Sequence, residues 1–347
     1  MRFGIGPFSA EAFGNVGWTE AYEVMGQAAR VAEESGFDSV WVAERNFTDD
    51  GYCPSAFVAA ASLAAQTEAL KIGVMPILGL AHPLYVAEDA AVIDILSAGR
   101  AIIMPINAVA HELAAHAIPE SSYDSRFSES VSVLLDAWSA RPFSFRGEHW
   151  TIPAQLDGHV ENRSGMVTVT PKPAQIELPL WIGGFWDYGR RLAAELGLPM
   201  VLGAVSDNSL LGDLWGDYDR DAQASGRRPL RVLIRDVYVS NGDDPASECA
   251  HMLSRQFERY DSWGLWSGDA SDFEALARGR FLIGNPDAVI EQIREIDDRC
   301  GLDKLICRMH FPGMPLHQLL RSVRLFSSEV IPEFRMPDLP HQIRQGV

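Results

Sequence analysis

The stretch FDSVWVAERNFTDDGY, residues 37 to 52, changes abruptly from an apolar run to a polar one. Its first part, FDSVWVA, has the β-branched and aromatic content of a buried strand. Within the next few positions the chain presents Glu44, Arg45, Asn46 and Asp49. A surface loop can contain such a cluster by chance. A barrel enzyme places polar side chains at the ends of its strands because its substrate binds there.

The same alternation of short apolar runs and amphipathic helical stretches recurs along the chain. We expect strands over residues 2–6, 39–43, 71–77, 101–105, 179–184, 199–204, 231–240 and 304–311. We expect helices over residues 19–34, 55–67, 83–96, 126–140, 188–196, 209–225, 245–261, 287–299 and 316–331. Repeated strand–helix units imply a parallel sheet covered by helices, and eight of them imply closure. The sequence therefore predicts an α/β fold, a (β/α)8 TIM barrel.

The regular pattern is interrupted once. Residues 143–173 contain two short strand-like pieces, which predict an insertion after the fourth βα unit. We expect one domain over residues 1–335, with a mobile loop at about 263–280 and a C-terminal tail over 336–347. The alternative is an open doubly wound sheet with a glycine-rich dinucleotide turn after its first strand. GIGPF fits that turn poorly, because Pro7 follows the GxG and no helix begins there.

Composition narrows the class of protein. The 347 residues carry a formal net charge of −18, which argues against binding a nucleic acid backbone. The four cysteines show no CxxC spacing, which is typical of reduced thiols in a cytosolic protein. The N-terminus enters an apolar strand without a secretory signal, and no apolar run approaches the length of a membrane helix. We therefore expect a cytoplasmic protein without nucleic acid or membrane partners.

In a barrel, the carboxyl ends of the strands surround one mouth, where the active site lies. The positions expected there are Pro7, Phe8, Glu44–Asn46, Met75–Leu78, Ile106, Asn107, Gly183–Trp186, Gly203–Ser206, Asp236 and His310. His111 and His116 lie nearby without HExxH spacing, so we expect no metal site. His111 is a candidate general base, because histidine titrates near neutrality. His82 precedes a helix and is expected to be structural.

Several segments together carry a resemblance. SGFDSVWVAERNFTDDG, LGLAHPLYVAEDAAVIDILSAGR, PLWIGG and GMPLHQLLRSVRLFSSEVIPEFR resemble, in order, segments of the bacterial luciferase-like flavin-dependent monooxygenases, over about residues 1–335. The resemblance implies a two-component enzyme on a (β/α)8 barrel. A separate flavin reductase would supply reduced FMN, which would react with O2 to a flavin hydroperoxide that oxidises a small organic substrate. It also implies a homodimer that packs on helices 55–67 and 83–96.

Two alternatives stay open within this resemblance. One branch of the family uses the deazaflavin F420 for hydride transfer and needs no O2. The other alternative is a flavin- or ligand-binding barrel without turnover, because the expected catalytic histidine and phosphate-binding arginine are both missing. Oxygen consumption would separate the first two hypotheses, and any turnover would exclude the third.

The family pattern after strand two is E-H-H-F, and this chain has Glu44-Arg45-Asn46-Phe47. Arg45 and Asn46 thus occupy the two histidine positions, of which the first is catalytic in luciferases. An arginine stays protonated and cannot act as a base near neutral pH. It can donate to a peroxide oxygen or hold an anionic group of a substrate. The bland alternative is a surface pair of Arg45 with Asp49 or Glu44. We do not expect luminescence without the histidine.

The resemblance also implies cofactor contacts. Backbone contact to the flavin is expected after strand three from Val74, Met75 and Pro76, with an ordinary trans proline as the alternative. Asn107 stands at the position of the phosphate-binding arginine and carries no charge. The phosphate loop corresponds to Phe185, Trp186, Asp187, Tyr188 and Gly189, at a helix N-terminus that suits an anion. Trp186 and Tyr188 could instead cover the substrate or pack in the core. This phosphate site predicts that FMN is lost on purification.

Overall fold

The computed structural model describes residues 1–12, 17–154, 165–184, 186–222 and 230–335. The strands are β1 (Arg2–Phe8), β2 (Ser39–Ala43), β3 (Lys71–Met75), β4 (Ala101–Ile103), β5 (Phe145–Arg146), β6 (Thr151–Ile152), β7 (Ile182–Gly183), β8 (Met200–Leu202), β9 (Arg231–Val239), β10 (Phe281–Gly284) and β11 (Lys304–Arg308). The α-helices are α1 (Trp18–Glu34), α2 (Ala56–Gln66), α3 (Pro83–Leu96), α4 (Ala110–Ala115), α5 (Tyr123–Trp138), α6 (Asp187–Leu196), α7 (Leu211–Ala222), α8 (Pro245–Ser262), α9 (Phe273–Arg278), α10 (Pro286–Cys300), α11 (Leu316–Leu325) and α12 (Ile331–Phe334). Short turns of other helix types are Glu120–Ser122, Asn208–Leu210 and the π-helical Phe326–Val330.

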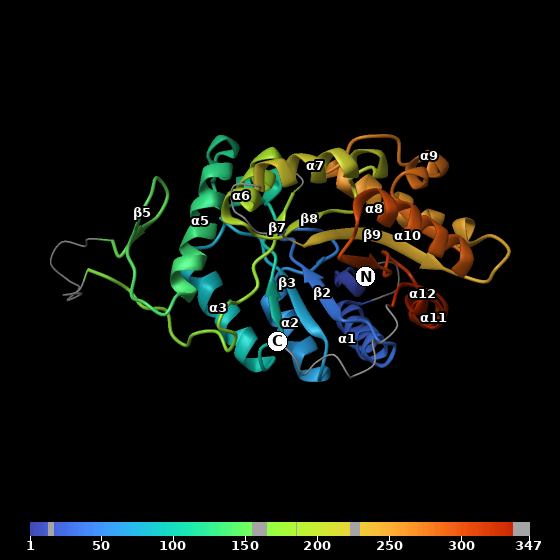
Figure 1. The fold of residues 1–347 in the computed structure, drawn as a ribbon, viewed down its shortest axis with the longest axis horizontal. Coiled ribbons are helices and arrows are strands. Elements are labelled where there is room, and N and C mark those ends of the chain that lie inside the picture. Colours follow the sequence, from blue (N-terminus) through green and yellow to red (C-terminus); the bar gives the residue numbers. More distant parts are fainter. Residues whose placement is uncertain (13–16, 155–164, 185, 223–229, 336–347) are drawn as a thin grey trace, which may run out of the picture.

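The main sheet is parallel and curled, and helices surround it (Figure 1). Its order is β4-β3-β2-β1-β11-β9-β8-β7, with β10 paired to the second half of the long strand β9. The two ends of this order meet at Ile103. Its N–H donates to Pro179 O, and its carbonyl accepts from Trp181 N–H, both at 2.9 Å. The order never reverses direction, so the alternative of an open doubly wound sheet is wrong.

One end of the sheet interior is filled by large side chains. Trp41 on β2 packs on Trp181 just before β7, with ring centroids 5.1 Å apart. Glycines on the neighbouring strands make room here, because a Cβ atom on Gly73 would collide with the Trp41 indole and one on Gly4 with the Ser39 hydroxyl. The indole N–H donates to the Ser39 hydroxyl at 2.9 Å. These strands are buried on both faces, as in parallel sheets generally, and the open space lies at the other end.

The helices begin and end where the sequence indicates. Pro83 is the first residue of α3, and the His82 ring before it accepts from Leu84 N–H at 3.3 Å, so the expected structural role of His82 is confirmed. The Asn285 side chain accepts from Ala288 N–H at 2.9 Å and caps α10. Gly301 ends the same helix in the left-handed conformation, at φ 64°.

The predicted α/β alternation is confirmed, and each of the eight expected strands is present. Helix α4 was missed because six residues carry too little periodicity to detect. Helix α9 and strand β10 were missed because they lie within or directly after the glycine-, serine- and aspartate-rich segment that was read as a loop. The expected helix over 316–331 is interrupted by the π-helical turn Phe326–Val330.

The segment after α5 departs from the strand–helix alternation. Strands β5 and β6 form an antiparallel hairpin, which projects beyond α5 in Figure 1. Phe143 bridges Val167 in antiparallel fashion farther along. Residues 155–164 of the predicted insertion lie outside the described residues, so the insertion stays a prediction.

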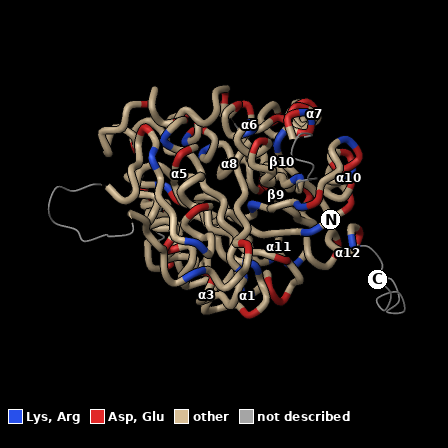
Figure 2. Tube along the Cα trace, turned by 60° about the vertical axis from the view of Figure 1, so that its left-hand side comes forward, with Lys and Arg blue, Asp and Glu red and all other residues tan. Residues whose placement is uncertain are grey.

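The outer helices carry much of the acidic charge. Figure 2 shows this on α7, which holds four aspartates and one arginine. The cysteines Cys53, Cys249, Cys300 and Cys307 are all buried and unpaired. Every helix in the described part of the chain is too short or too polar to cross a lipid bilayer.

Candidate active site

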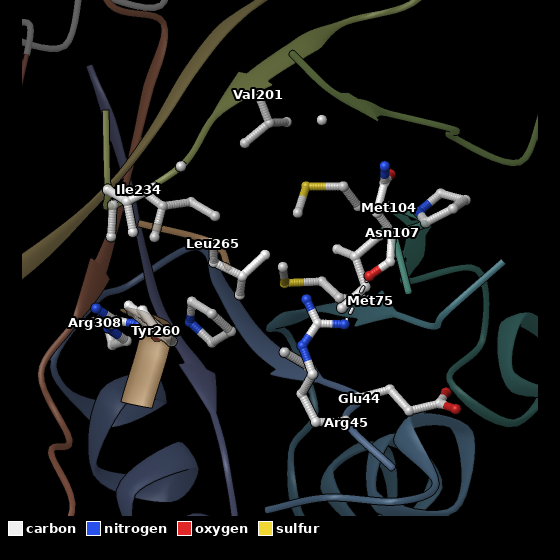
Figure 3. Close-up of a pocket in the computed structure, with 18 of the residues that line it drawn as sticks. Glu44, Arg45, Met75, Met104, Asn107, Val201, Ile234, Tyr260, Leu265 and Arg308 are labelled. Atoms are coloured by element: carbon white, nitrogen blue, oxygen red, sulfur yellow. Dashed lines mark hydrogen bonds between the residues drawn. The ribbon is translucent and has the colours of Figure 1, made fainter. Parts of the chain in front are cut away.

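A cavity opens at the carboxyl ends of the strands, opposite Trp41. The empty space in it is about 870 Å³ when the opening to solvent is counted. Its walls are mostly apolar, and three of the residues come from the end of α8 and the loop after it (Figure 3). The lining residues include Pro7, Ala43, Glu44, Arg45, Tyr52, Met75, Met104, Asn107, Gly183, Trp186, Val201, Gly203, Ile234, Tyr260, Trp263, Leu265 and Arg308.

Many of the residues that were expected at the strand ends line this cavity. Pro7, Glu44, Arg45, Met75, Ile106, Asn107, Gly183, Trp186 and Gly203–Val205 line the cavity as expected from the sequence. Asp236 lies behind it, fully buried. His310 packs against Phe8, with ring centroids 6.2 Å apart, and burial lowers the pKa of His310 to about 4. Parallel strands bring their carboxyl ends together, which is why the mouth was predictable.

Arg45 is buried, with 7% of its surface exposed. Its Nη1 donates to the Asn107 carbonyl at 2.7 Å and lies 3.5 Å from a Glu112 carboxylate oxygen. Its guanidinium also lies 6.0 Å from the centroid of the Trp263 ring. The alternative of a surface pair with Asp49 or Glu44 is therefore wrong. In Figure 3 the Glu44 carboxylate is turned away from the Arg45 guanidinium.

Glu112 on α4 organises the polar stretch that follows β2. One of its oxygens accepts from Asn46 N–H and the other from Val109 N–H, each at 2.8 Å. His111, on the same helix, places Nε2 3.0 Å from the Asn46 carbonyl oxygen. The turn that carries Arg45 and Asn46 is thus held by two adjacent residues of α4. His111 lines a second, open cavity on the far side of Trp263 rather than the main one.

The environment of Glu44 favours the neutral form of its carboxyl group. Burial is the largest cause and raises the pKa of Glu44 to about 7. A hydrogen bond from Asn46 Nδ2, 3.0 Å from Glu44 Oε1, opposes this increase only in part. A carboxyl group that titrates near neutrality in a cavity wall can accept or release a proton.

A second arginine lines the cavity and has a different set of partners. Arg308, at the end of β11, makes two parallel hydrogen bonds to Asp236 on β9, at 2.5 and 2.6 Å. Its third nitrogen donates to the Tyr260 hydroxyl. Asp236 raises the pKa of Arg308 despite the opposing effect of burial. Each of the three guanidinium nitrogens of Arg308 therefore donates a hydrogen bond.

The segment predicted to contact a flavin ring through its backbone is built into the sheet. The carbonyls of Val74, Met75 and Pro76 accept from the backbone N–H groups of Met104, Glu44 and Ile106 respectively. Of the three residues, Met75 lines the cavity. In the described residues the cis peptide bonds precede Pro7, Pro153 and Pro171, so the Met75–Pro76 bond is trans.

The predicted phosphate loop lies at the start of α6. Trp186 lines the cavity and is the N-cap residue of the helix, and its side chain makes no capping hydrogen bond. Asn107 donates to the Tyr188 hydroxyl, and Asp187 is exposed and lies 3.9 Å from Arg190, which pairs with Asp221. A Cβ atom on Gly189 would collide with the Gly183 carbonyl, so the helix can approach β7 only with glycine there. Phe185 lies outside the described residues.

These residues fit FMN by their chemistry. The apolar cavity suits a flat ring system, and the N-terminus of α6, where the N-cap side chain makes no capping bond, offers N–H donors to a phosphate. The phosphate charge would meet Asp187 as well as the arginines that follow it, so the site is electrostatically weak. In the described ranges, no group of three or more histidine, cysteine or acidic residues could hold a metal ion.

Sequence reasoning missed Glu112, Tyr260 and the pairing of Asp236 with Arg308 as parts of this site. Glu112 stands between the two histidines that drew attention, and its role depends on a contact to Asn46 across 66 positions. Asp236 and Arg308 lie 72 positions apart. The available signal was their position at the ends of two predicted strands, where buried charges must be paired.

Comparisons with known proteins agree with the geometry. The family model of luciferase-like monooxygenases matches residues 1–302. An alkanal monooxygenase alpha chain from Photorhabdus luminescens is 39% identical over 350 residues, covering 90% of this chain and 92% of that protein. The oxygenase component of the flavin-dependent trigonelline monooxygenase from Acinetobacter baylyi is 22% identical and covers 91% of this chain and 90% of its own length.

Solved structures show the same fold. Monooxygenase RslO1 from Streptomyces bottropensis superposes with a TM-score of 0.85 at 22% identity, covering 96% of this chain and all of that one. The oxygenating constituent of 3,6-diketocamphane monooxygenase from Pseudomonas putida, solved with FMN, gives 0.77 at 21% identity, covering 97% and 99%. An F420-dependent secondary alcohol dehydrogenase gives 0.72 at 17%, covering 96% and 99%. The family resemblance drawn from the sequence is confirmed: the chain belongs to the luciferase-like monooxygenase family.

Proposed function

We propose that this protein is the oxygenase component of a two-component flavin-dependent monooxygenase. A separate flavin reductase would supply reduced FMN, and the substrate would be a small organic molecule. When bound, reduced FMN supplies the two electrons with which one atom of O2 enters the substrate and the other leaves as water. The observation that carries the proposal is the apolar cavity at the strand ends, beside the N-terminus of α6, in a chain of this family.

The fold part of the proposal is a closed (β/α)8 barrel over residues 1–335, with the insertion at about 143–173. The backbone hydrogen bonds of Ile103 to residues 179 and 181 support closure. Met75, Asn107 and Trp186 would flank the flavin, and Asp187–Gly189 would direct their N–H groups to its phosphate. The loop that begins at Trp263 would cover the cavity, since Trp263 and Leu265 line it. A lid of this kind excludes water from the reaction.

The polar residues of the site would have different roles in the reaction. We propose that Arg45 contacts the reacting molecules, because it combines burial with a place in the cavity wall. Asn46 and His111 would position the turn that carries Arg45, since both contact the same α4–β2 junction. Glu44 would exchange a proton near neutral pH.

An anaerobic titration of the purified protein with photoreduced FMN tests the proposal. We expect saturable binding and, after mixing with oxygenated buffer, slower return of the oxidised flavin absorbance than for free reduced FMN. An absence of binding would contradict the proposal. The same titration with reduced F420 tests the second candidate, which the structural likeness to an F420-dependent enzyme favours. Binding of either cofactor without any turnover would favour a non-catalytic barrel.

We also propose a homodimer that packs on α2 and α3. Apolar side chains on these helices are exposed, including Val58 at 71%, Tyr85 at 66% and Leu96 at 63%. Neighbouring exposed apolar side chains of this kind often mark an interface between proteins. Light scattering after size-exclusion chromatography should give twice the chain mass for the wild type and a shift toward monomer for Leu96→Glu. A wild-type monomer would contradict this proposal.

A further inference from the structure

The cavity contains two arginines, but the charge of only one of them is fully matched. Arg308 is held by a bidentate pair with Asp236 and by the Tyr260 hydroxyl. Bidentate arginine–carboxylate pairs are strong, and breaking this one would leave a buried aspartate alone. Arg308 is therefore a structural cation, with a hydrogen bond from each of its three nitrogens and a carboxylate that balances its charge.

Arg45 has a much weaker set of protein partners. Both of its polar contacts use Nη1, and the carboxylate oxygen of Glu112 is 3.5 Å away. That carboxylate already accepts two backbone N–H groups at 2.8 Å. Among the residues that the structure describes, neither Nε nor Nη2 of Arg45 meets an acceptor. Neither is among the buried atoms that are cut off from solvent.

The free side of this guanidinium opens into the cavity. Figure 3 shows Nη2 of Arg45 directed toward the space between Met75 and Leu265. Met75, Leu265 and Trp263 form apolar walls around it. A guanidinium presents its N–H groups in a planar fork that matches a carboxylate. In an apolar cavity such a pair is stronger than in water, because little solvent competes.

We propose that the substrate of this protein carries a carboxylate, which binds the free N–H groups of Arg45 while the apolar remainder packs on Met75, Leu265 and Trp263. That the bound carboxylate belongs to a substrate rests on the proposed function. The anion site itself rests only on the contacts of Arg45. It assigns to this position the holding of a substrate anion, and not donation to oxygen.

Calorimetric titration of the purified protein with octanoate and with octanol tests the anion site. The two probes share an apolar chain and differ in charge. We expect octanoate to bind at least about tenfold more tightly than octanol to the wild type, a difference of about 1.4 kcal/mol. Arg45→Met should remove the preference, and Arg45→Lys should restore part of it, because lysine keeps the charge but loses the fork. Arg141→Met is the matched control at an exposed arginine and should behave as the wild type.

The outcomes separate this inference from the proposed function. Equal binding of both probes by the wild type, or a preference that persists in Arg45→Met, overturns the anion site. An Arg45-dependent preference without binding of reduced FMN supports the anion site and contradicts the monooxygenase. If Arg45→Met loses reduced FMN but keeps the octanoate preference, Arg45 serves the flavin and the inference is wrong. If Arg45→Met does not fold, Arg45→Lys and Arg45→His decide by the same comparison.

Discussion

Arg45, two residues after β2, and Arg308, at the end of β11, line the same cavity from strands separated only by β1, and they are almost equally buried, at 7% and 5% exposed. Each has a fully buried carboxylate nearby, Glu112 and Asp236 respectively. Asp236 directs both oxygens to Arg308, whereas Glu112 directs its oxygens mainly to backbone N–H groups. Two residues with the same charge and similar burial, both close to a strand end, therefore have different energetic roles.

The difference shows that burial alone does not separate a structural charge from a functional one. The number of donors already satisfied by the protein separates them. A cation held by a bidentate carboxylate stabilises the fold and has little affinity left for an anion, whereas a cation with two free nitrogens in a cavity contributes less to the fold and can bind an anion.

The largest expected effect is a loss of stability when Arg308 is replaced. Arg308→Met leaves Asp236 buried without a partner and should lower the free energy of unfolding by about 3–5 kcal/mol. Urea denaturation followed by circular dichroism measures this. The double variant Arg308→Met with Asp236→Leu should recover most of the loss. A loss below about 1 kcal/mol in the single variant would show that the pair is not the buried structural charge described above.

The second effect concerns Glu44, a carboxyl of the Arg45 side that lacks a cation partner. Burial raises the pKa of Glu44 from 4.5 to about 7, so the folded state binds the proton more tightly than the unfolded state. Wild-type stability should therefore fall, relative to Glu44→Gln, as the pH rises from about 4.5 to about 7.

At about pH 8 the Glu44→Gln variant should be more stable than the wild type by up to about 3 kcal/mol, and at about pH 4 the difference should vanish. Urea denaturation at both pH values checks this, with the exposed Glu34→Gln as the matched control. A variant that is less stable than the wild type at the higher pH would mean that Glu44 is held as a carboxylate.

How much could be predicted from the sequence differs between the fold and the site. The eight strands follow from runs such as SVWVA, which are buried on both faces and need no tertiary information. The position of the cavity could be predicted because parallel strands bring their carboxyl ends together. Arg45 could be predicted as a site residue because it comes just after the strand β2. These are local signals that a single chain carries.

The partners of the site residues could not be predicted in the same way. The short helix α4 carries Glu112 to Asn46, and the pairing of Asp236 with Arg308 depends on β9 lying beside β11. The pKa of Glu44 depends on burial by segments distant in the sequence. Contacts of this kind are set by packing, so the surface pair of Arg45 with Asp49 or Glu44 was a reasonable but wrong alternative.

A third substitution changes Glu112, the acidic partner of Arg45. Glu112→Gln keeps an acceptor for one backbone N–H and removes the charge beside Arg45. We expect a loss of about 1–3 kcal/mol in the free energy of unfolding, smaller than for Arg308→Met. Octanoate should bind more tightly to this variant than to the wild type, because one negative charge near the anion is gone. Weaker octanoate binding in a folded variant would indicate that Glu112 orients Arg45 more than it neutralises it.

The smallest effect is at Tyr260, which accepts one hydrogen bond from Arg308. Tyr260→Phe removes that hydroxyl while the two bonds to Asp236 remain. The free energy of unfolding should fall by about 0.5–1.5 kcal/mol. Thermal and urea unfolding of this variant beside Arg308→Met would rank the partners of Arg308. An effect as large as that of Arg308→Met would place the main stabilisation at Tyr260.

A crystal structure of the protein grown anaerobically with reduced FMN and octanoate would show directly which arginine binds the anion. We expect the flavin ring in the cavity at the strand ends, the octanoate carboxylate within hydrogen-bond distance of Arg45, and Arg308 still paired with Asp236. A carboxylate bound to Arg308, or an Arg45 engaged by the flavin alone, would contradict the role proposed for Arg45.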